Sequence, residues 1–127
     1  MKIKVTLLFT AYDKTVDMVD INHNKIFLND ELEFPYCYLA AKDPSDAINE
    51  ICYNNFRFDP SWLMSIVSGF RKISPTEFEV VYLSSRPMVK NSIKLGDFYT
   101  MYQVLSSEKQ IDPYYEQILR SHNFFVV

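Results

Sequence analysis

Glycine is almost absent from this sequence of 127 residues, in which only Gly69 and Gly96 occur. Because the two are isolated, the chain has no G-x-G-x-x-G pattern and no glycine-rich loop of the kind that cradles phosphate groups. Long apolar runs are missing too, and no segment approaches the roughly 18 apolar residues of a membrane span. The opening segment 1–9 turns from charged to apolar, but it lacks the small-residue cleavage site of a signal peptide. We therefore expect a soluble cytoplasmic protein without a membrane partner.

Thiols and imidazoles are equally scarce. Cys37 and Cys52 have neither the close spacing of a redox pair nor the number that a secreted disulfide framework requires. Together with His23 and His122, the two cysteines make four possible zinc ligands. Neither the cysteine pair nor the histidine pair has the short spacing of zinc sites, so we expect no zinc site. The sequence predicts two free thiols and no resident metal or cofactor.

Neither sign of charge predominates strongly, since the chain has 13 Lys and Arg and 16 Asp and Glu, for a net charge of −3. The basic residues are too scattered to neutralise a run of phosphates, so we expect no nucleic-acid partner. Apolar and aromatic residues are plentiful instead, at 48% and 16% of the chain. At this length they predict one compact domain over residues 1–127. The preference for Lys, Asn, Ile, Phe and Tyr is typical of AT-rich genomes, as in many phages or low-GC bacteria.

Extended segments dominate the first part of the chain. Residues 2–10 alternate apolar and polar side chains, as in a strand with one buried face. A turn and a weaker alternation over residues 12–21 predict that this strand continues into a hairpin. Short extended pieces are expected over 26–28 and 32–39, where Pro35 indicates a strand end or an edge.

The second half shows three further extended segments. Residues 62–73 fit a helix or a strand, and we expect a strand because a turn at 74–76 connects them to the β-branched and aromatic run 78–83. Residues 88–96 are expected to form a loop. Residues 98–105 are apolar on both sides, which predicts a strand buried on both faces.

Two helices are predicted, and an Asp–Pro pair marks the start of each. Asp43–Pro44 and Asp112–Pro113 each place an N-cap acceptor before a proline at the first helical position. The apolar residues that follow have helical spacing, and they are Ala47, Ile48, Ile51 and Cys52 in the first helix and Tyr115, Ile118, Leu119 and His122 in the second. Glu116 and Arg120 are placed to pair on the outer face of the second helix.

The order of these elements resembles the Nudix hydrolase fold across most of the chain. Four segments carry the resemblance: Phe34–Pro35, Pro44–Ala47, Glu79–Leu83 and Asp112–Leu119. They are similar to the apolar residue and proline before the motif loop, the start of the motif helix, the strand after that helix and the closing helix. The resemblance implies an α+β fold, in which a motif helix and a C-terminal helix pack on a mixed sheet.

The Nudix motif itself, G-x5-E-x7-R-E-U-x-E-E-x-G-U, is mostly missing. When Glu50 is matched to the first Glu of the motif helix, Asn49 stands at the Arg, and Tyr53 and Asn54 stand at the next Glu pair. When Pro44 is matched to the helix start instead, none of the Glu ligands remains. Mg²⁺ needs carboxylate oxygens, and neutral Asn or Tyr does not supply the lost charge. The resemblance therefore implies a degenerate motif without a metal site, in which Glu50 is catalytic only if hydrolysis survives.

A crowd of aromatic residues surrounds this region: Phe34, Tyr36, Tyr38, Tyr53, Phe56, Phe58 and Trp62. Most are expected in the core, and those that line an open cleft would stack on a base while an Arg meets a phosphate. The candidate ligand-binding residues are Tyr36, Tyr38, Arg57, Arg71 and Arg86. Exposed aromatic side chains with Arg would equally suit a protein-binding surface.

Three hypotheses follow. The first is a pseudoenzyme, a catalytically silent Nudix-like domain that binds a protein partner or a nucleotide-type ligand. The second is an atypical, Mg²⁺-dependent Nudix hydrolase of nucleoside diphosphate derivatives, in which Glu50 acts with Asp43, Asp46 or Glu79. The third is an unrelated small α+β interaction protein.

Overall fold

The computed structural model describes residues 1–12, 25–39, 43–106 and 111–121. The hairpin predicted over 12–21 and the helix position of His122 therefore lie outside the described residues, apart from Tyr12. Within the described ranges, helices and strands follow one another closely along the chain.

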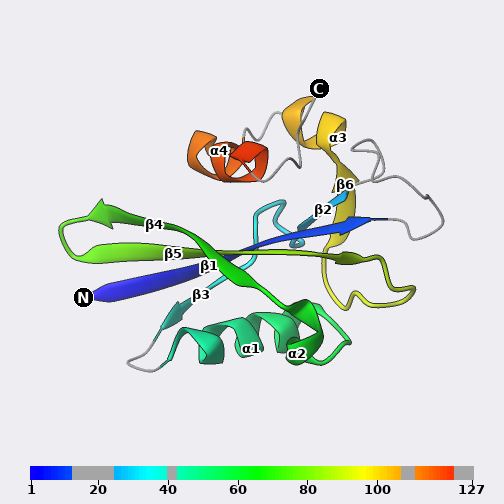
Figure 1. The fold of residues 1–127 in the computed structure, drawn as a ribbon, viewed down its shortest axis with the longest axis horizontal. Coiled ribbons are helices and arrows are strands. Elements are labelled where there is room, and N and C mark those ends of the chain that lie inside the picture. Colours follow the sequence, from blue (N-terminus) through cyan, green and yellow to red (C-terminus); the bar gives the residue numbers. More distant parts are fainter. Residues whose placement is uncertain (13–24, 40–42, 107–110, 122–127) are drawn as a thin grey trace.

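One mixed sheet forms the centre of the molecule (Figure 1). Its strands are β1 (Lys2–Tyr12), β2 (Lys25–Leu28), β3 (Tyr36–Leu39), β4 (Ile66–Ser74), β5 (Glu77–Pro87) and β6 (Asp97–Thr100). They lie in the order β4-β5-β1-β2-β6, and β3 also pairs with β1. β1 runs parallel to β5 along its whole length, whereas the other pairings are antiparallel.

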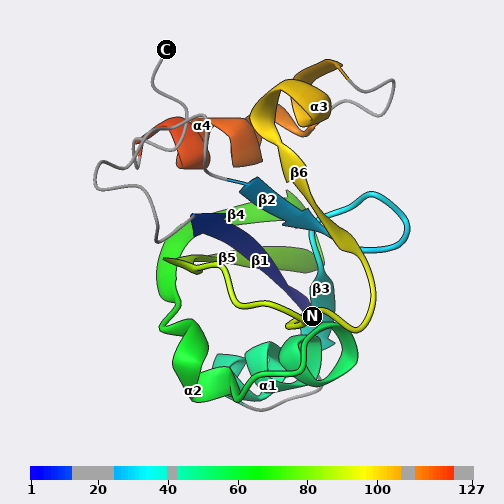
Figure 2. The same cartoon turned by 90° about the vertical axis from the view of Figure 1, so that its right-hand side faces the viewer.

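Helices cover both faces of the sheet, as Figures 1 and 2 show. α1 (Pro44–Asn55) and α2 (Pro60–Leu63) lie on one face, and α4 (Pro113–Ser121) lies on the other beside α3 (Met101–Ser106). The predicted α+β architecture, with a motif helix and a C-terminal helix packed on a mixed sheet, is confirmed. None of the helices in the described ranges is long and apolar enough to cross a membrane.

The central position of β1 corrects the expectation that only one of its faces is buried. Val5, Leu7 and Phe9 belong to the core under α1, as the alternation predicts. Thr6 and Thr10, predicted on a polar face, are buried as well because α4 covers their side of the sheet. Polar residues at these positions are tolerated since their hydroxyls donate hydrogen bonds, Thr6 to Glu79 and Thr10 to the Ser84 carbonyl oxygen.

Both predicted helix starts are confirmed. The Asp43 carboxylate accepts a hydrogen bond from the Ser45 amide at 3.0 Å, and Asp112 accepts one from the Tyr114 amide at 2.9 Å. These bonds satisfy backbone donors that have no partner inside the helix. The apolar residues predicted to share a face of α1 are all buried, and so are Tyr115, Ile118 and Leu119 of α4. The outer pair also forms, with Arg120 Nη2 at 2.7 Å from Glu116 Oε1.

The segment 62–73 is a strand only from Ile66 onward. Its first residues belong to α2, which Asp59 caps by accepting a hydrogen bond from the Ser61 amide at 2.9 Å. Asp59–Pro60, which follows the end of α1, therefore starts a short helix in the same way that Asp43–Pro44 starts α1 and Asp112–Pro113 starts α4. Met64, with a φ of 50°, then turns the chain into β4. The hairpin of β4 with β5, predicted from the turn at 74–76, is confirmed.

The prediction of one strand over 98–105 is wrong in its second half. β6 ends at Thr100, where the Thr100 hydroxyl accepts a hydrogen bond from the Gln103 amide and the Gln103 side chain accepts one from the Thr100 amide. This reciprocal pair is a capping box, which starts α3. Tyr102, expected in a doubly buried strand, is 80% exposed on that helix.

The extended segment predicted over 32–39 is shorter than expected. β3 begins at Tyr36, because Asn29–Glu33 forms a turn closed by a backbone hydrogen bond of 2.8 Å from Asn29 to Glu33. Leu32 takes a φ of 61° within that turn. The loop predicted over 88–96 is confirmed, apart from a single bridge between Ile93 and Phe56.

Candidate ligand-binding site

The α1 face of the sheet carries the region that corresponds to the degenerate motif. Glu50 lines a wide surface hollow there and accepts a hydrogen bond from the Cys37 thiol at 3.0 Å. Partial burial, this hydrogen bond and the negative charge of Glu50 raise the pKa of Cys37 to about 11. Two further carboxylates line the hollow, but Asp43 and Asp59 are engaged as the N-caps of α1 and α2. Within the described ranges, no three His, Cys, Asp or Glu side chains come together as metal ligands would.

A fully buried carboxylate lies on the opposite face of the sheet. Glu79 of β5 is 0% exposed and accepts three hydrogen bonds. Its donors are the Thr6 hydroxyl at 2.6 Å, Nε of Arg71 at 2.7 Å and the hydroxyl of Tyr115 in α4. Burial and the hydrogen bond to Glu79 raise the pKa of Tyr115, so this hydroxyl keeps its proton. A buried carboxylate is tolerated only with such partners, and the network ties β1, β4, β5 and α4 together.

Arg71 extends this network to the start of α4. Its Nη2 lies 2.8 Å from Oδ2 of Asp112, and its guanidinium lies 4.3 Å from the centre of the Tyr114 ring. Burial opposes the charge of Arg71, but the bonds to Asp112 and Glu79 outweigh it and raise its pKa. Burial likewise opposes the charge of Asp112, and the hydrogen bonds from Arg71 and the Tyr114 amide outweigh it and lower its pKa. Asp112, which also lines a cavity, is therefore held ionised.

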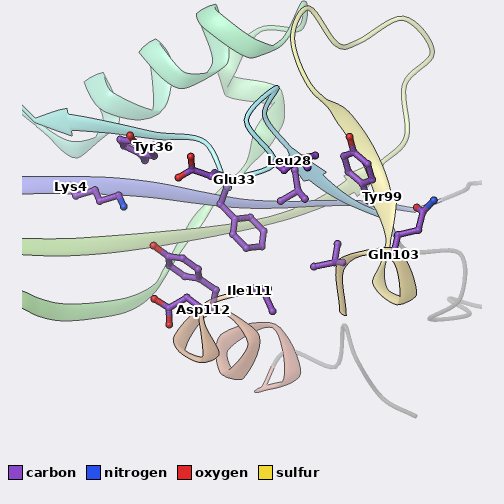
Figure 3. A pocket seen from close by; sticks show the side chains of 12 residues that line it. Lys4, Leu28, Glu33, Tyr36, Tyr99, Gln103, Ile111 and Asp112 are labelled. Atoms are coloured by element: carbon purple, nitrogen blue, oxygen red, sulfur yellow. The ribbon is translucent and has the colours of Figure 1, made fainter. Parts of the chain in front are cut away.

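This cavity lies between the sheet, α3 and α4, and has a volume of about 380 Å³ (Figure 3). Its lining residues are Lys4, Leu28, Leu32, Glu33, Phe34, Tyr36, Tyr99, Gln103, Val104, Ile111, Asp112 and Tyr115. Apolar and aromatic side chains make up most of the wall. Small-molecule sites in proteins combine this composition with a few polar groups at defined places.

The polar groups of the cavity are concentrated at its two ends, as Figure 3 shows. Lys4, Glu33 and Asp112 lie toward one end, and Gln103 lies at the other end beside Tyr99. Between them Leu28 and Ile111 face the interior. An occupant with one apolar or aromatic part and one polar part would therefore meet matching surfaces.

Backbone register places the side chains of the polar end. β3 runs antiparallel to β1 with Tyr36 opposite Thr6 and Tyr38 opposite Lys4, so all four side chains point to the α4 face. The ammonium group of Lys4 lies 4.4 Å from the centre of the Tyr36 ring, in cation–π contact. At the other end the capping box orients Gln103. Its side-chain oxygen accepts a hydrogen bond from the Thr100 backbone amide, and its side-chain nitrogen can donate to a ligand.

The structure divides the five predicted ligand-binding residues between the two faces of the sheet. Tyr36 lines the cavity and its neighbour Tyr38 stands beside it, with ring centres 5.8 Å apart. Arg71 does not line the cavity, but binds Asp112, which does. Arg57 lies on the α1 face and donates from Nε to the Ile93 carbonyl oxygen at 3.3 Å, and Arg86 lies 4.8 Å over the ring of Trp62. The structure therefore does not bring these five residues to one site.

Sequence reasoning missed several lining residues. The alternation over residues 2–10 predicts Lys4 on the solvent side of a strand, and the apolar pattern over 98–105 predicts Tyr99 and Gln103 in a doubly buried strand. The T-x-x-Q pattern of Thr100 and Gln103 is a signal that would have placed a helix start beside the cavity. Nothing local marks Lys4, whose neighbours in the cavity come from distant segments.

Comparison with solved structures identifies the fold as Nudix-like. The chain matches a MutT/Nudix family protein from Enterococcus faecalis with a TM-score of 0.51 and 12% identity, over 77% of this chain and 43% of that one. It also matches a protein from Sinorhizobium meliloti 1021, provisionally named an oxidoreductase, with a TM-score of 0.52 and 12% identity, over 97% and 38% of the two chains. The chain thus spans about two fifths of the length of either protein. No protein-family model matches the sequence, and no curated protein matches it significantly. The resemblance found in the sequence is confirmed for the fold, which is all that similarity at this identity shows.

Proposed function

We propose that this chain is a catalytically silent Nudix-like domain, folded as one unit over residues 1–127, that binds a nucleotide-type ligand in the cavity under α4. The ligand class we propose is a nucleoside or a nucleoside monophosphate. The observation that carries the proposal is the cavity of about 380 Å³, with an aromatic and apolar wall and a polar end at Lys4, Glu33 and Asp112.

The size and wall of the cavity support a flat, mostly apolar ligand part. Small-molecule sites range from roughly 300 to 1,000 Å³, so this volume suits a compact ligand rather than an extended one. Phe34, Tyr99 and Tyr115 offer aromatic surfaces for a base. The amide nitrogen of Gln103 is available to a carbonyl oxygen or ring nitrogen on the edge of that base.

The charges at the polar end support few phosphates. Lys4 supplies one positive charge, whereas Glu33 and Asp112 supply two carboxylates, which accept hydrogen bonds from hydroxyl groups such as those of a ribose. Arg71 adds little attraction for an anion, because Glu79 and Asp112 already neutralise it. Each phosphate beyond the first would add negative charge beside the Asp112 carboxylate.

The carboxylates that the hydrolase alternative needs are not gathered around Glu50. Asp43 caps α1, Asp46 is exposed on the first turn of that helix, and Glu79 lies across the sheet. Nudix chemistry uses several carboxylates around divalent ions, and one Glu with a thiol neighbour does not replace them. This geometry supports binding without hydrolysis.

Titration calorimetry with a series of nucleosides, monophosphates and triphosphates tests the proposal. We expect the monophosphate to bind at least as tightly as the nucleoside, and the triphosphate to bind more weakly than the monophosphate. Lys4→Gln should weaken monophosphate binding by about tenfold, the loss expected for one charge-assisted hydrogen bond, and leave nucleoside binding nearly unchanged. Tyr99→Ala should weaken both.

The chain offers matched controls on the other face of the sheet. Lys94 lies 4.7 Å from the centre of the Tyr53 ring, a contact like that of Lys4 with Tyr36. Lys94→Gln and Tyr53→Ala should therefore leave the affinity unchanged. Tightest binding of the triphosphate would overturn the proposed ligand class. Loss of binding in Lys94→Gln rather than in Lys4→Gln would assign the ligand to the α1 face and overturn the proposed site.

A further inference from the structure

One carboxylate in the wall of the cavity is held in place by two donors. Nη2 of Arg71 donates to Oδ2 of Asp112 at 2.8 Å, and the Tyr114 amide donates to Oδ1 at 2.9 Å. Arg71 is fixed in turn, because its Nε donates at 2.7 Å to Glu79, which is fully buried. The position of Asp112 is therefore set by the core of the sheet as well as by the start of α4.

These two hydrogen bonds leave half of the acceptor capacity of the carboxylate for a ligand. An ionised carboxylate has about four lone-pair sites, two on each oxygen. Among the described residues, Arg71 uses one site on Oδ2 and the Tyr114 amide uses one on Oδ1. The Asp112 side chain is 39% exposed and lines the cavity, so a ligand there can reach the carboxylate. Each oxygen can thus accept one further hydrogen bond.

The charges around Asp112 favour hydroxyl groups over a cationic ligand. Burial opposes the charge of Asp112, but the hydrogen bonds from Arg71 and the Tyr114 amide, together with the positive charges of Arg71 and Lys4, keep its pKa below the ordinary value. A further cation would meet these two positive charges at close range, whereas hydroxyl groups donate hydrogen bonds without adding charge. Two neighbouring hydroxyls on one face of a sugar ring would offer one donor to each oxygen.

We infer that the cavity selects the cis-diol of a ribose, with Asp112 accepting hydrogen bonds from the 2′- and 3′-hydroxyl groups and Arg71 acting as the positioning residue. This inference rests on the proposed nucleotide site and names its sugar, so that ribonucleotides bind more tightly than deoxyribonucleotides. The base then lies toward Tyr99 and Gln103, and a 5′-phosphate lies toward Lys4, at the same end of the cavity as Asp112 (Figure 3).

Loss of either hydroxyl would remove a donor from a charged acceptor. Hydrogen bonds to charged groups are stronger than those between neutral groups. A site built to bond a hydroxyl therefore discriminates against the analogue that lacks it, because the acceptor loses its partner. Partial exposure of Asp112 lets water replace a missing hydroxyl, which limits the expected effect to about tenfold for each hydroxyl.

Titration calorimetry of the wild-type chain with modified sugars tests the inference. The ligands are the 5′-monophosphates of adenosine, guanosine, cytidine and uridine, each compared with its 2′-deoxy and 3′-deoxy forms. A bound ribonucleotide should have a dissociation constant about tenfold lower than that of either deoxy form. The arabino form is the matched ligand, because it keeps both hydroxyls but places them on opposite faces of the ring. It should bind like the 2′-deoxy form.

Variants of the chain separate recognition of the diol from general stability. Arg71→Lys keeps a positive charge but lacks the planar fork that reaches Glu79 and Asp112 together. Arg71→Lys and Asp112→Asn should each reduce the preference for the ribonucleotide over its 2′-deoxy form severalfold, and leave the affinity for a 2′,3′-dideoxy form nearly unchanged. A loss of stability alone would weaken all ligands in parallel and would not change this preference. Asp43→Asn is the matched control, since Asp43 caps α1 as Asp112 caps α4 but does not line the cavity.

The possible results distinguish failure of this inference from failure of the proposed function. Equal affinities for the ribo and deoxy forms, arabino forms that bind as tightly as the ribonucleotides, or an unchanged preference in both Arg71→Lys and Asp112→Asn would each overturn the selection of a diol and leave the nucleotide site in place. A change of preference in Asp43→Asn would overturn the assignment to Asp112. Absence of binding by every ligand would overturn the proposed function and this inference with it.

Discussion

Glu50 and Glu79 lie on opposite faces of the central sheet, Glu50 on α1 beside Cys37 and Glu79 under α4 against Tyr115. The strand β1 separates them, with Val5, Leu7 and Phe9 toward α1 and Thr6 and Leu8 toward α4. Two carboxylates on opposite faces of a packed sheet do not share a metal ion. A hydrolase mechanism that combines Glu50 with Glu79 is therefore incompatible with this fold.

Replacing Glu50 by Gln is expected to make the Cys37 thiol more reactive. Burial, the hydrogen bond to Glu50 and its negative charge raise the pKa of Cys37 to about 11, and the substitution removes the charge. A lower pKa increases the thiolate fraction, and the thiolate is the species that iodoacetamide modifies. Mass spectrometry of Cys37 alkylation as a function of pH should show a several-fold faster reaction.

Cys52 provides an internal control for this experiment. Its pKa is raised to about 12, mainly by burial, so its slow alkylation should be the same in both proteins. Asp46→Asn removes another carboxylate from α1, which should not affect Cys37. Equal Cys37 rates in wild type and Glu50→Gln would show that the two side chains do not interact in solution.

Tyr115→Phe is expected to lower the free energy of unfolding by about 1–3 kcal/mol, because it removes a donor from a fully buried carboxylate. Tyr114→Phe is the matched control. Tyr114 covers Arg71 through its ring, and no hydrogen bond from its hydroxyl to Glu79 is present. Loss of the Tyr114 hydroxyl should therefore lower the free energy of unfolding by less than loss of the Tyr115 hydroxyl. Urea-induced unfolding of the two variants measures the difference, and equal losses would argue against a stabilising role of the Tyr115–Glu79 bond.

Asp112→Asn is expected to destabilise the protein in a pH-dependent way. The folded-state pKa of Asp112 lies below its ordinary value of 3.8, chiefly because the bonds from Arg71 and the Tyr114 amide outweigh burial. Its contribution is therefore fully present above that ordinary value and is lost as pH falls through the lowered pKa. Near neutral pH the substitution should cost up to about 1 kcal/mol, because Asn still caps the helix but removes the charge that pairs with Arg71.

Urea unfolding of wild type and Asp112→Asn between neutral and acidic pH measures this dependence. The difference between the two proteins should be constant near neutral pH and shrink in acid. The exposed Asp30→Asn serves as the control, with little effect at any pH. A difference that grows in acid would reverse the sign and contradict the assigned ionisation of Asp112.

Local chemistry in the sequence predicted the elements whose signals are contained within a few residues. Asp43–Pro44 and Asp112–Pro113 predict α1 and α4 because a cap and a fixed proline φ act only on their own helix start. Asp59–Pro60 carries the same signal and starts α2, but the mixed spacing of the residues after it suits a strand as well as a helix. The capping box at Thr100 was hidden by an apolar pattern that suits a strand.

The candidate site depends on contacts that no local pattern records. In the sequence, Glu79 looks like a polar residue on an exposed strand face. Its burial is tolerated because Thr6 and Tyr115 donate hydrogen bonds to it, and these two residues lie 73 and 36 positions away in the sequence. The cavity likewise takes Lys4 from β1 and Asp112 from the start of α4. Such a constellation follows from strand order and helix placement, which one sequence does not specify.

Phosphorus NMR of a mixture of nucleotides with the protein and Mg²⁺ is the most direct test of a silent, ligand-binding domain. The account predicts that a nucleoside monophosphate resonance broadens or shifts on adding the protein, and that no new phosphate resonance grows with time. At the same concentrations the effect should be weaker with Lys4→Gln and unchanged with Lys94→Gln. New product resonances from diphosphate compounds, present with the wild-type chain and absent with Glu50→Gln, would show a working hydrolase and contradict the account.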